Sequence, residues 1–120
     1  MARASAAGEA AALDGLDASQ TANLIGFTGL NTGDPATTGA NEYAGVTRQA
    51  TSWNRANTST GQKTNSGSMS FTTSGATPVT HFSEWSAGTS GTYAIGGLLA
   101  SAVTAANISI AAGALTLAAS

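Results

Sequence analysis

The sequence predicts an all-β fold, a single antiparallel β-sandwich of jelly-roll-like type, preceded by a short N-terminal helix or arm. Short runs of alternating apolar and polar residues recur from Thr21 onward, and turn-forming Gly and Ser residues separate them. A chain of 120 residues also has the size of one domain. The expected organisation is therefore a helical arm over residues 1–20 and a β-sandwich domain over residues 21–120.

The N-terminal segment is the one predicted helix, over residues 5–18. Leu13 and Leu16 belong to a thin apolar stripe at helical spacing. Gly8 and Gly15 each cost about 1 kcal/mol relative to Ala, so the helix is weak and needs a surface on which to dock.

The first predicted strand is TANLIGFTGL, residues 21–30. Leu24 and Leu30 fall on one face, and Ile25 and Phe27 fall on the other, which indicates burial on both sides. We therefore expect the first strand to be buried on both of its faces.

The next two segments are more polar. VTRQATSW, which contains Arg48, mixes β-branched and polar residues in a way that suits a solvated strand. NRANTSTGQKTNSG, residues 54–67, is predicted to be a polar connector, because it has two glycines and no apolar period.

Further short strands follow in the second half. SMSFTTS places Met69 and Phe71 on one face, and PVTHFSEWS begins with Pro78, which a strand tolerates at its first residue. After the predicted turn AGTSG, the segment TYAIGGLLA alternates again. NISIAAGALTLAA holds two short apolar runs separated by AAG, which is consistent with a hairpin or a tight corner.

The composition excludes several classes of partner. Charged residues make up 8% of the chain and the net charge is −2, so neither a nucleic-acid-binding face nor a polybasic strip for lipid is expected. No apolar run is long enough to span a bilayer. A surface with so little charge is poorly protected from self-association. Either partners cover much of it, or the composition reflects an alanine-rich source genome.

The residues that could carry chemistry do not assemble into a site. His81 is the single histidine, and on a strand Glu84 would point to the opposite face, so we expect a packed histidine. Asp34 and Glu42 provide too few oxygen ligands for a dedicated Ca²⁺ loop, and the chain has no cysteine. We therefore expect no catalytic, cofactor or metal site and a protein that is not an enzyme.

Three segments resemble, in order, a family of small tailed-bacteriophage virion proteins: GLNTGDPATTGANEYAGVTRQATSW, PVTHFSEWSAGTSGTYAIGGLLAS and ISIAAGALTLA. That family has a Leu-His-Thr-x-Asp-Pro-Gly loop, a Thr-Gly-Ala-Asn-Glu segment, an Ala-Arg-Gln strand, a Thr-His-Phe-x-x-Trp strand and a closing Ala-Gly-Ala-Leu-Thr strand. The resemblance covers most of residues 21–118, with Asn31 in place of the usual His and Ala36 in place of the usual Gly. It implies a virion structural protein without enzymatic activity.

Within the virion, the expected location is the head surface, where the chain would act as a capsid decoration or cement protein on the major capsid protein lattice. A compact module with a weak arm and no shaft suits such docking, and the local symmetry axes of a capsid favour a homotrimer. The alternative is a tail, baseplate or tail-fibre component that contacts host glycans through Trp53, Trp85 or the tyrosines, although core packing is the favoured role for these rings. A free carbohydrate-binding module or enzyme is the least favoured hypothesis.

The predicted contact surface combines the helical stripe with the polar loop after the first strand. In this loop Asp34-Pro35 and Gly39 shape turns, and Asn41 and Glu42 can satisfy backbone groups. The candidate interface residues are Leu13, Leu16, Asn31, Thr32, Asp34, Pro35, Asn41, Glu42 and Tyr43.

Overall fold

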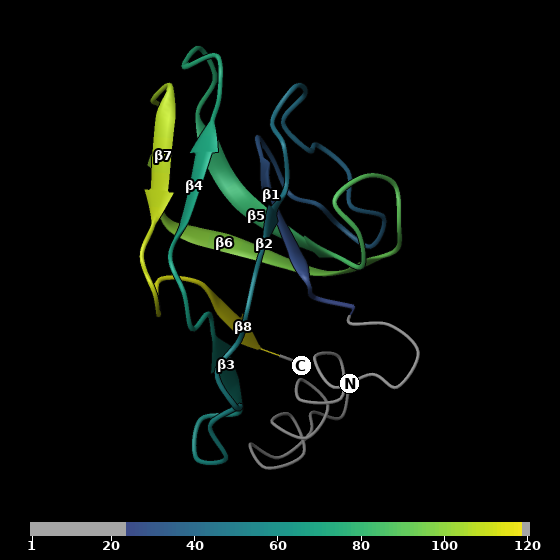
Figure 1. Ribbon diagram of the computed structural model, residues 1–120, viewed down its shortest axis with the longest axis vertical. Helices are drawn as coiled ribbons and strands as arrows, with labels where there is room; N and C mark the ends of the chain where they lie inside the picture. Colours follow the sequence, from purple (N-terminus) through teal and green to yellow (C-terminus); the bar gives the residue numbers. More distant parts are fainter. Residues whose placement is uncertain (1–23, 119–120) are drawn as a thin grey trace.

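The computed structural model describes residues 24–118, and in this range the chain forms strands and loops without a helix (Figure 1). Every strand pairing is antiparallel, which confirms the predicted all-β antiparallel class. The predicted helix over residues 5–18, with Leu13 and Leu16, lies outside the described residues.

The described strands form one sheet and two ribbons. A four-stranded sheet has the order β2-β1-β5-β6, and two-stranded ribbons pair β3 with β8 and β4 with β7. The strands are β1 (Phe27–Asn31), β2 (Gln49–Ala50), β3 (Gln62–Thr64), β4 (Met69–Thr72), β5 (Val79–Trp85), β6 (Tyr93–Val103), β7 (Asn107–Ile110) and β8 (Thr116–Ala118).

The hydrophobic core lies between the sheet and the ribbons. On the inner face of the sheet, Leu30 pairs across from Phe82, and both side chains are buried. Met69 and Phe71 point into the same core from β4, as their alternation predicts. Burying a side chain of this size contributes roughly 1.5–3 kcal/mol. β7, β8 and the segment between them add Ile108, Ile110, Leu115 and Leu117 to this core.

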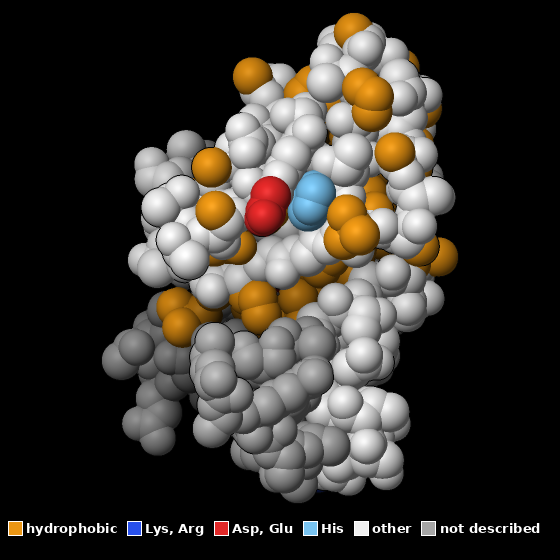
Figure 2. All heavy atoms as spheres, turned by 180° about the vertical axis from the view of Figure 1, so that it is seen from behind, with side chains coloured by type: hydrophobic (Ala, Val, Ile, Leu, Met, Phe, Trp, Pro, Cys, Tyr) orange, Lys and Arg blue, Asp and Glu red, His pale blue; other side chains and the backbone are white. Residues whose placement is uncertain are grey.

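The outer face of the sheet is different in character. The register places Gly29 opposite Ser83 and Asn31 opposite His81, so the middle of this side carries small and polar side chains, and Phe27 lies opposite Trp85 at its end. In Figure 2 the histidine is visible near the middle of a face that shows scattered hydrophobic side chains and no Lys or Arg side chain from residues 24–118. This face carries the polar contacts of the candidate site.

The chain turns a corner between β7 and β8. Since β7 pairs with β4 and β8 with β3, the corner is observed and the alternative hairpin is not. Gly113 has a φ of 79° and its amide donates to the Asn65 carbonyl at 2.8 Å. The buried Asn65 side chain also donates to the Ala111 carbonyl at 3.0 Å and accepts from the Leu115 amide at 2.9 Å. Asn65 therefore holds the corner in place.

The predicted connector over residues 54–67 is not purely a connector, because it contains β3. This strand pairs with β8, far away in the sequence, and Lys63 within it is only 1% exposed. The expected strand around Arg48 is shorter than predicted: β2 spans Gln49–Ala50, and Trp53 forms a separate bridge with Asn65. In β3 and in β2, pairing with a distant strand determines where the strand lies, and the local alternation of apolar residues does not.

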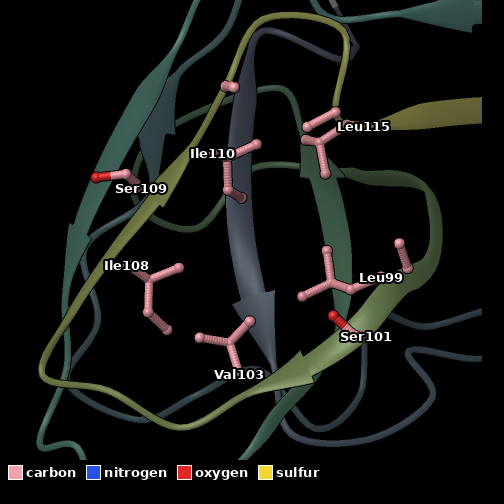
Figure 3. Close-up of a pocket in the computed structure, with 10 residues that line it drawn as sticks. Leu99, Ser101, Val103, Ile108, Ser109, Ile110 and Leu115 are labelled. Carbon is pink, nitrogen blue, oxygen red and sulfur yellow. The ribbon is translucent and has the colours of Figure 1, made fainter.

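The sheet meets the ribbons at two places: β2 contacts β4, and β6 contacts β8. Within residues 24–118, β6 forms backbone pairs only with β5 and β7 only with β4, so β6 and β7 are not joined by a ladder. A hollow of about 290 Å³ lies between β6 and β7 (Figure 3). Its apolar lining includes Leu99, Val103, Ile108, Ile110 and Leu115.

Glu84 is a carboxyl group inside the core. It is 0% exposed, it accepts a hydrogen bond from the Thr28 hydroxyl at 2.7 Å, and its Oε1 has no partner among the described residues. Burial raises the pKa of Glu84 well above its ordinary value, and the hydrogen bond from Thr28 opposes this rise only in part. Burial in the core therefore favours the protonated form of this carboxyl.

Replacing Glu84 with Gln should remove much of the dependence of stability on pH. In the unfolded chain this carboxyl ionises near its ordinary pKa of 4.5, whereas the folded protein retains the proton to higher pH. Stability is thus full below that pKa and falls as pH rises toward the folded pKa, by up to about 1.4 kcal/mol per pH unit.

Urea denaturation of wild type and Glu84→Gln at a series of pH values from below 4.5 upward measures how the free energy of unfolding depends on pH. The control is Glu42→Gln, which should lose stability at neutral pH because Glu42 is ion-paired with Arg48. Equal pH slopes for wild type and Glu84→Gln would contradict the assignment.

Candidate functional site

The loop between β1 and β2, residues 32–48, packs on the outer face of the sheet, and we call it the covering loop. It folds back along the end of β1. The Thr32 amide donates to the Asn41 carbonyl at 2.9 Å, and the Tyr43 amide donates to the Leu30 carbonyl at 2.8 Å. These backbone bonds make the first part of the loop a regular extension of the sheet edge.

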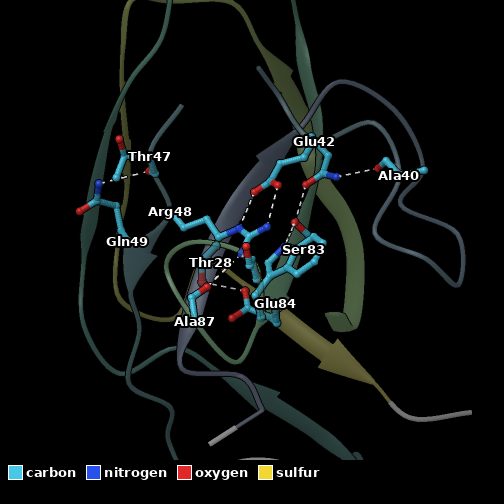
Figure 4. Close-up of polar contacts among 12 residues, drawn as sticks. Thr28, Ala40, Glu42, Thr47, Arg48, Gln49, Ser83, Glu84 and Ala87 are labelled. Atoms are coloured by element: carbon cyan, nitrogen blue, oxygen red, sulfur yellow. Dashed lines mark hydrogen bonds and ion pairs between the residues drawn. The ribbon is translucent and has the colours of Figure 1, made fainter. Parts of the chain in front are cut away.

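Arg48 fastens the end of the covering loop (Figure 4). Its Nε and Nη2 donate to the two carboxylate oxygens of Glu42 at 2.7 and 2.9 Å, a bidentate pair. Its Nη1 donates to the carbonyls of Ala87 and Ser90, in the predicted turn between β5 and β6. The guanidinium carbon lies 3.7 Å from the ring centroid of Trp85. One side chain thus joins the loop, the turn and β5.

A second set of contacts runs across the sheet to the loop. Trp85 Nε1 donates to Ser83 Oγ at 2.8 Å, and Ser83 Oγ donates to Asn31 Oδ1 at 2.7 Å. Asn31 Nδ2 then donates to the Ala40 carbonyl at 2.9 Å. Because Asn31 and Ser83 are fully buried, these bonds satisfy polar groups that water cannot reach.

Two glycines create the space for this packing. A Cβ at Gly29 would lie 2.5 Å from Glu42 Oε2, and a Cβ at Gly39 would lie 2.5 Å from the Trp85 ring. Gly39 also has a φ of 78°, which favours glycine. The close approach of the loop to the sheet therefore depends on both residues.

Several predicted interface residues are internal to this chain. Asn31, Pro35 and Tyr43 are buried. The Tyr43 hydroxyl hydrogen-bonds to Ser74 Oγ at 2.8 Å and so links the covering loop to the loop before β5. These three side chains have structural roles within the fold.

The remaining predicted residues of this loop face outward to different degrees. Asp34 and Asn41 are exposed, while Thr32 and Glu42 are half-buried. Asp34 Oδ1 accepts from the Ala36 amide at 2.8 Å, and Asn41 Nδ2 donates to the Asp34 carbonyl at 2.9 Å, as expected for residues that shape turns. That this surface is an interface stays a prediction.

The aromatic rings on the sheet and in the core make internal contacts. Trp53 is buried and its Nε1 donates to the Ile25 carbonyl at 2.7 Å. Trp85 and Tyr93 pack edge to face with centroids 5.4 Å apart. Burial, and then the charge of Asp34, raise the pKa of Tyr93. Its hydroxyl donates to the Ala36 carbonyl of the covering loop at 3.3 Å.

The histidine and the acidic residues do not form a reactive cluster. His81 lies on the outer face, where its Nδ1 hydrogen-bonds to Thr80 Oγ1 at 2.8 Å, whereas Glu84 points into the core. Their predicted separation on opposite faces is confirmed. Within residues 24–118, no three His, Cys, Asp or Glu side chains could together hold a metal ion. The same range contains no helix long and apolar enough to cross a membrane.

The role of Arg48 could not be predicted from its sequence context. The sequence predicts a solvated strand here, but the Arg48 side chain is 9% exposed. Besides Glu42 in its own loop, it contacts Trp85 and the carbonyls of Ala87 and Ser90, which lie far along the chain. The available signals were indirect: Arg48 is one of only four Lys and Arg residues in the chain, and glycines occupy both positions where the loop meets the sheet.

A well-packed β-domain with a polar loop fastened to its sheet fits a structural protein, and the comparison with protein families places the chain among phage virion structural proteins. It belongs to the family described as Podophage GP4 fiber I protein gp80, whose model matches residues 3–118. The phage virion class implied by the resemblance is thereby confirmed, although the match does not test the loop and strand motifs. No curated protein and no solved structure matches the chain.

Replacing Ala36 with Gly should stabilise the protein by about 0.5–1 kcal/mol. Ala36 has a φ of 55°, a conformation that costs a residue with a side chain roughly 1–2 kcal/mol. The greater freedom of glycine in the unfolded chain offsets part of this gain.

The matched control is Ala40→Gly, which is equally exposed and has no positive φ. It should lose about 0.5–1 kcal/mol. Chemical denaturation measures both variants, and destabilisation of similar size in the two would contradict the strain at Ala36.

Proposed function

We propose that the chain is a non-enzymatic component of a phage tail fibre. The observation that carries this proposal is the family match, because the family is described as a fiber protein and its model covers residues 3–118. Head decoration, which the sequence favoured, gains no support from this match. The tail-fibre alternative therefore becomes the main proposal.

The polar groups of the covering loop support a structural role. Three nitrogens of Arg48 and both carboxylate oxygens of Glu42 are used in internal contacts, which leaves little of this pair to bind a substrate. Glu84, whose pKa is the most strongly raised, is enclosed in the core. A catalytic group must reach its substrate, so this carboxyl is poorly placed for catalysis.

Contact with the host surface would involve the tip of the covering loop. Trp53 is buried, and the guanidinium of Arg48 covers the ring of Trp85, so neither tryptophan offers an open platform for a sugar. The exposed side chains at the tip are short and polar, and they can hydrogen-bond to a hydroxylated surface. They include Asp34, Thr37, Thr38 and Asn41.

Immunogold labelling of intact phage particles tests the location. We expect gold at the tail, together with a small number of copies per particle relative to the major capsid protein in quantitative mass spectrometry. Antibody pre-absorbed with the purified chain is the control. Uniform labelling of the head with hundreds of copies would overturn the proposal and restore head decoration.

A further inference from the structure

Glu84 belongs to a row of buried polar groups that we call the polar chain: Glu84, Thr28 and Thr51. Glu84 Oε2 lies 2.7 Å from Thr28 Oγ1, and Thr28 Oγ1 lies 2.5 Å from Thr51 Oγ1. Thr51 Oγ1 lies 3.1 Å from the carbonyl oxygen of Gln49 in β2 and 3.2 Å from Met69 Sδ in β4. Since β2 and β4 contact each other, the polar chain connects the carboxyl in β5 to the place where the sheet meets a ribbon.

The two threonine hydroxyls cannot supply every hydrogen that these contacts need. Each hydroxyl donates one hydrogen, and a charged carboxyl donates none. When Glu84 is charged, Thr28 donates to it, and Thr51 donates to Thr28. No hydrogen is then left for the Gln49 carbonyl or the Met69 sulfur, although both lie within reach of Thr51 Oγ1. The charged state therefore leaves the far end of the polar chain without its hydrogen bond.

A protonated carboxyl supplies the missing hydrogen. Glu84 then donates to Thr28, Thr28 donates to Thr51, and Thr51 donates onward to β2 or β4. In this state Glu84 Oε1, which has no partner among the described residues, is a neutral oxygen instead of part of a charged carboxylate. The hydrogen count and the burial of Glu84 thus favour the same protonation state.

The elements packed around Glu84 bring no charge that could balance a carboxylate. In β1 and β6, the residues opposite Glu84 are Thr28 and Ile95, and neither strand contains Asp, Glu, Lys, Arg or His; the same holds for β2 and β4. Burial and the Thr28 hydrogen bond set the pKa of Glu84, without a contribution from the buried Lys63 or the exposed Arg55. The titratable side chains that make their contacts on the outer face of the sheet are His81, Tyr93, Glu42 and Arg48.

We propose that the Glu84 proton locks the contact between β2 and β4, and that loss of this proton opens it. In the charged state, Thr51 no longer donates toward either strand, and Oε1 of Glu84 carries charge without a partner among residues 24–118. A buried carboxylate of this kind is unfavourable until water reaches it.

The short strand β2 is where the structure opens most easily. β2 has two residues, so its separation from β4 breaks few contacts and lets water approach the carboxylate. β2 directly follows Arg48, so the opening lies at the end of the covering loop. The lock belongs to the domain itself and applies equally to a tail or a head location.

NMR titration of the Glu84 carboxyl carbon in the full chain tests the polar chain. Thr28→Val removes the donor to the charged carboxyl, and hydrogen bonds to charged groups are the stronger ones, so the pKa of Glu84 should rise. Thr51→Val removes the acceptor that Thr28 needs in the protonated state, so the pKa should fall, although Thr51 reaches the carboxyl only through Thr28. Each variant should change the acid dissociation constant about threefold to tenfold, as expected for one hydrogen bond.

Hydrogen exchange of the Thr51 amide measures the opening itself. This amide donates to the Gly26 carbonyl at 2.8 Å, next to β2. Above the pKa of Glu84, its protection in wild type should be at least about tenfold lower than in Glu84→Gln at the same pH. The reason is that the glutamine amide donates to Thr28 at every pH.

The matched controls are Thr28→Ser and Thr51→Ser, which keep both hydroxyl groups and should titrate like wild type. Three results would each overturn the proposal. They are a Thr51→Val protein that titrates like wild type, valine variants that shift the pKa in the same direction, and equal protection of the Thr51 amide in wild type and Glu84→Gln.

Discussion

The outer half of this structure depends on the contacts of Arg48. Its bidentate pair with Glu42 fixes the covering loop, its bonds to two carbonyls fix the turn after β5, and its stacking on Trp85 ties both to the sheet. The pair is largely desolvated, so loss of either partner would leave a poorly hydrated charge. Gly29 and Gly39 allow this arrangement, because a side chain at either residue would prevent the covering loop from packing on the sheet.

The contrast between the two sides of the sheet follows from this arrangement. On the outer side, polar groups pair with one another across the covering loop, from Trp85 through Ser83 to Asn31. On the inner side, the Glu84 carboxyl is buried in the core, and this burial raises its pKa. Within residues 24–118, β6 lies at the edge of the four-stranded sheet and borders an apolar hollow.

The sequence predicts those features that depend on neighbouring residues alone, namely strands with period-two alternation and turns. The period-two alternation at Met69 and Phe71 identified a strand and its buried face, and Asp34-Pro35 identified a turn. β3 could not be predicted, because its pairing with β8 joins segments far apart in the chain and its central residue is Lys63. The predicted interface likewise included Asn31 and Tyr43, whose burial depends on contacts with Ser83 and Ser74 that no spacing in the sequence reveals.

A double-mutant cycle on Arg48 and Glu42 measures how strongly this ion pair holds the covering loop on the sheet. Arg48→Met and Glu42→Gln, alone and combined, are compared by chemical denaturation. Because the pair is bidentate and poorly hydrated, the two residues should show a coupling energy of about 1–3 kcal/mol. Additive effects, with a coupling below about 0.5 kcal/mol, would show that the covering loop does not depend on this pair and would contradict the account.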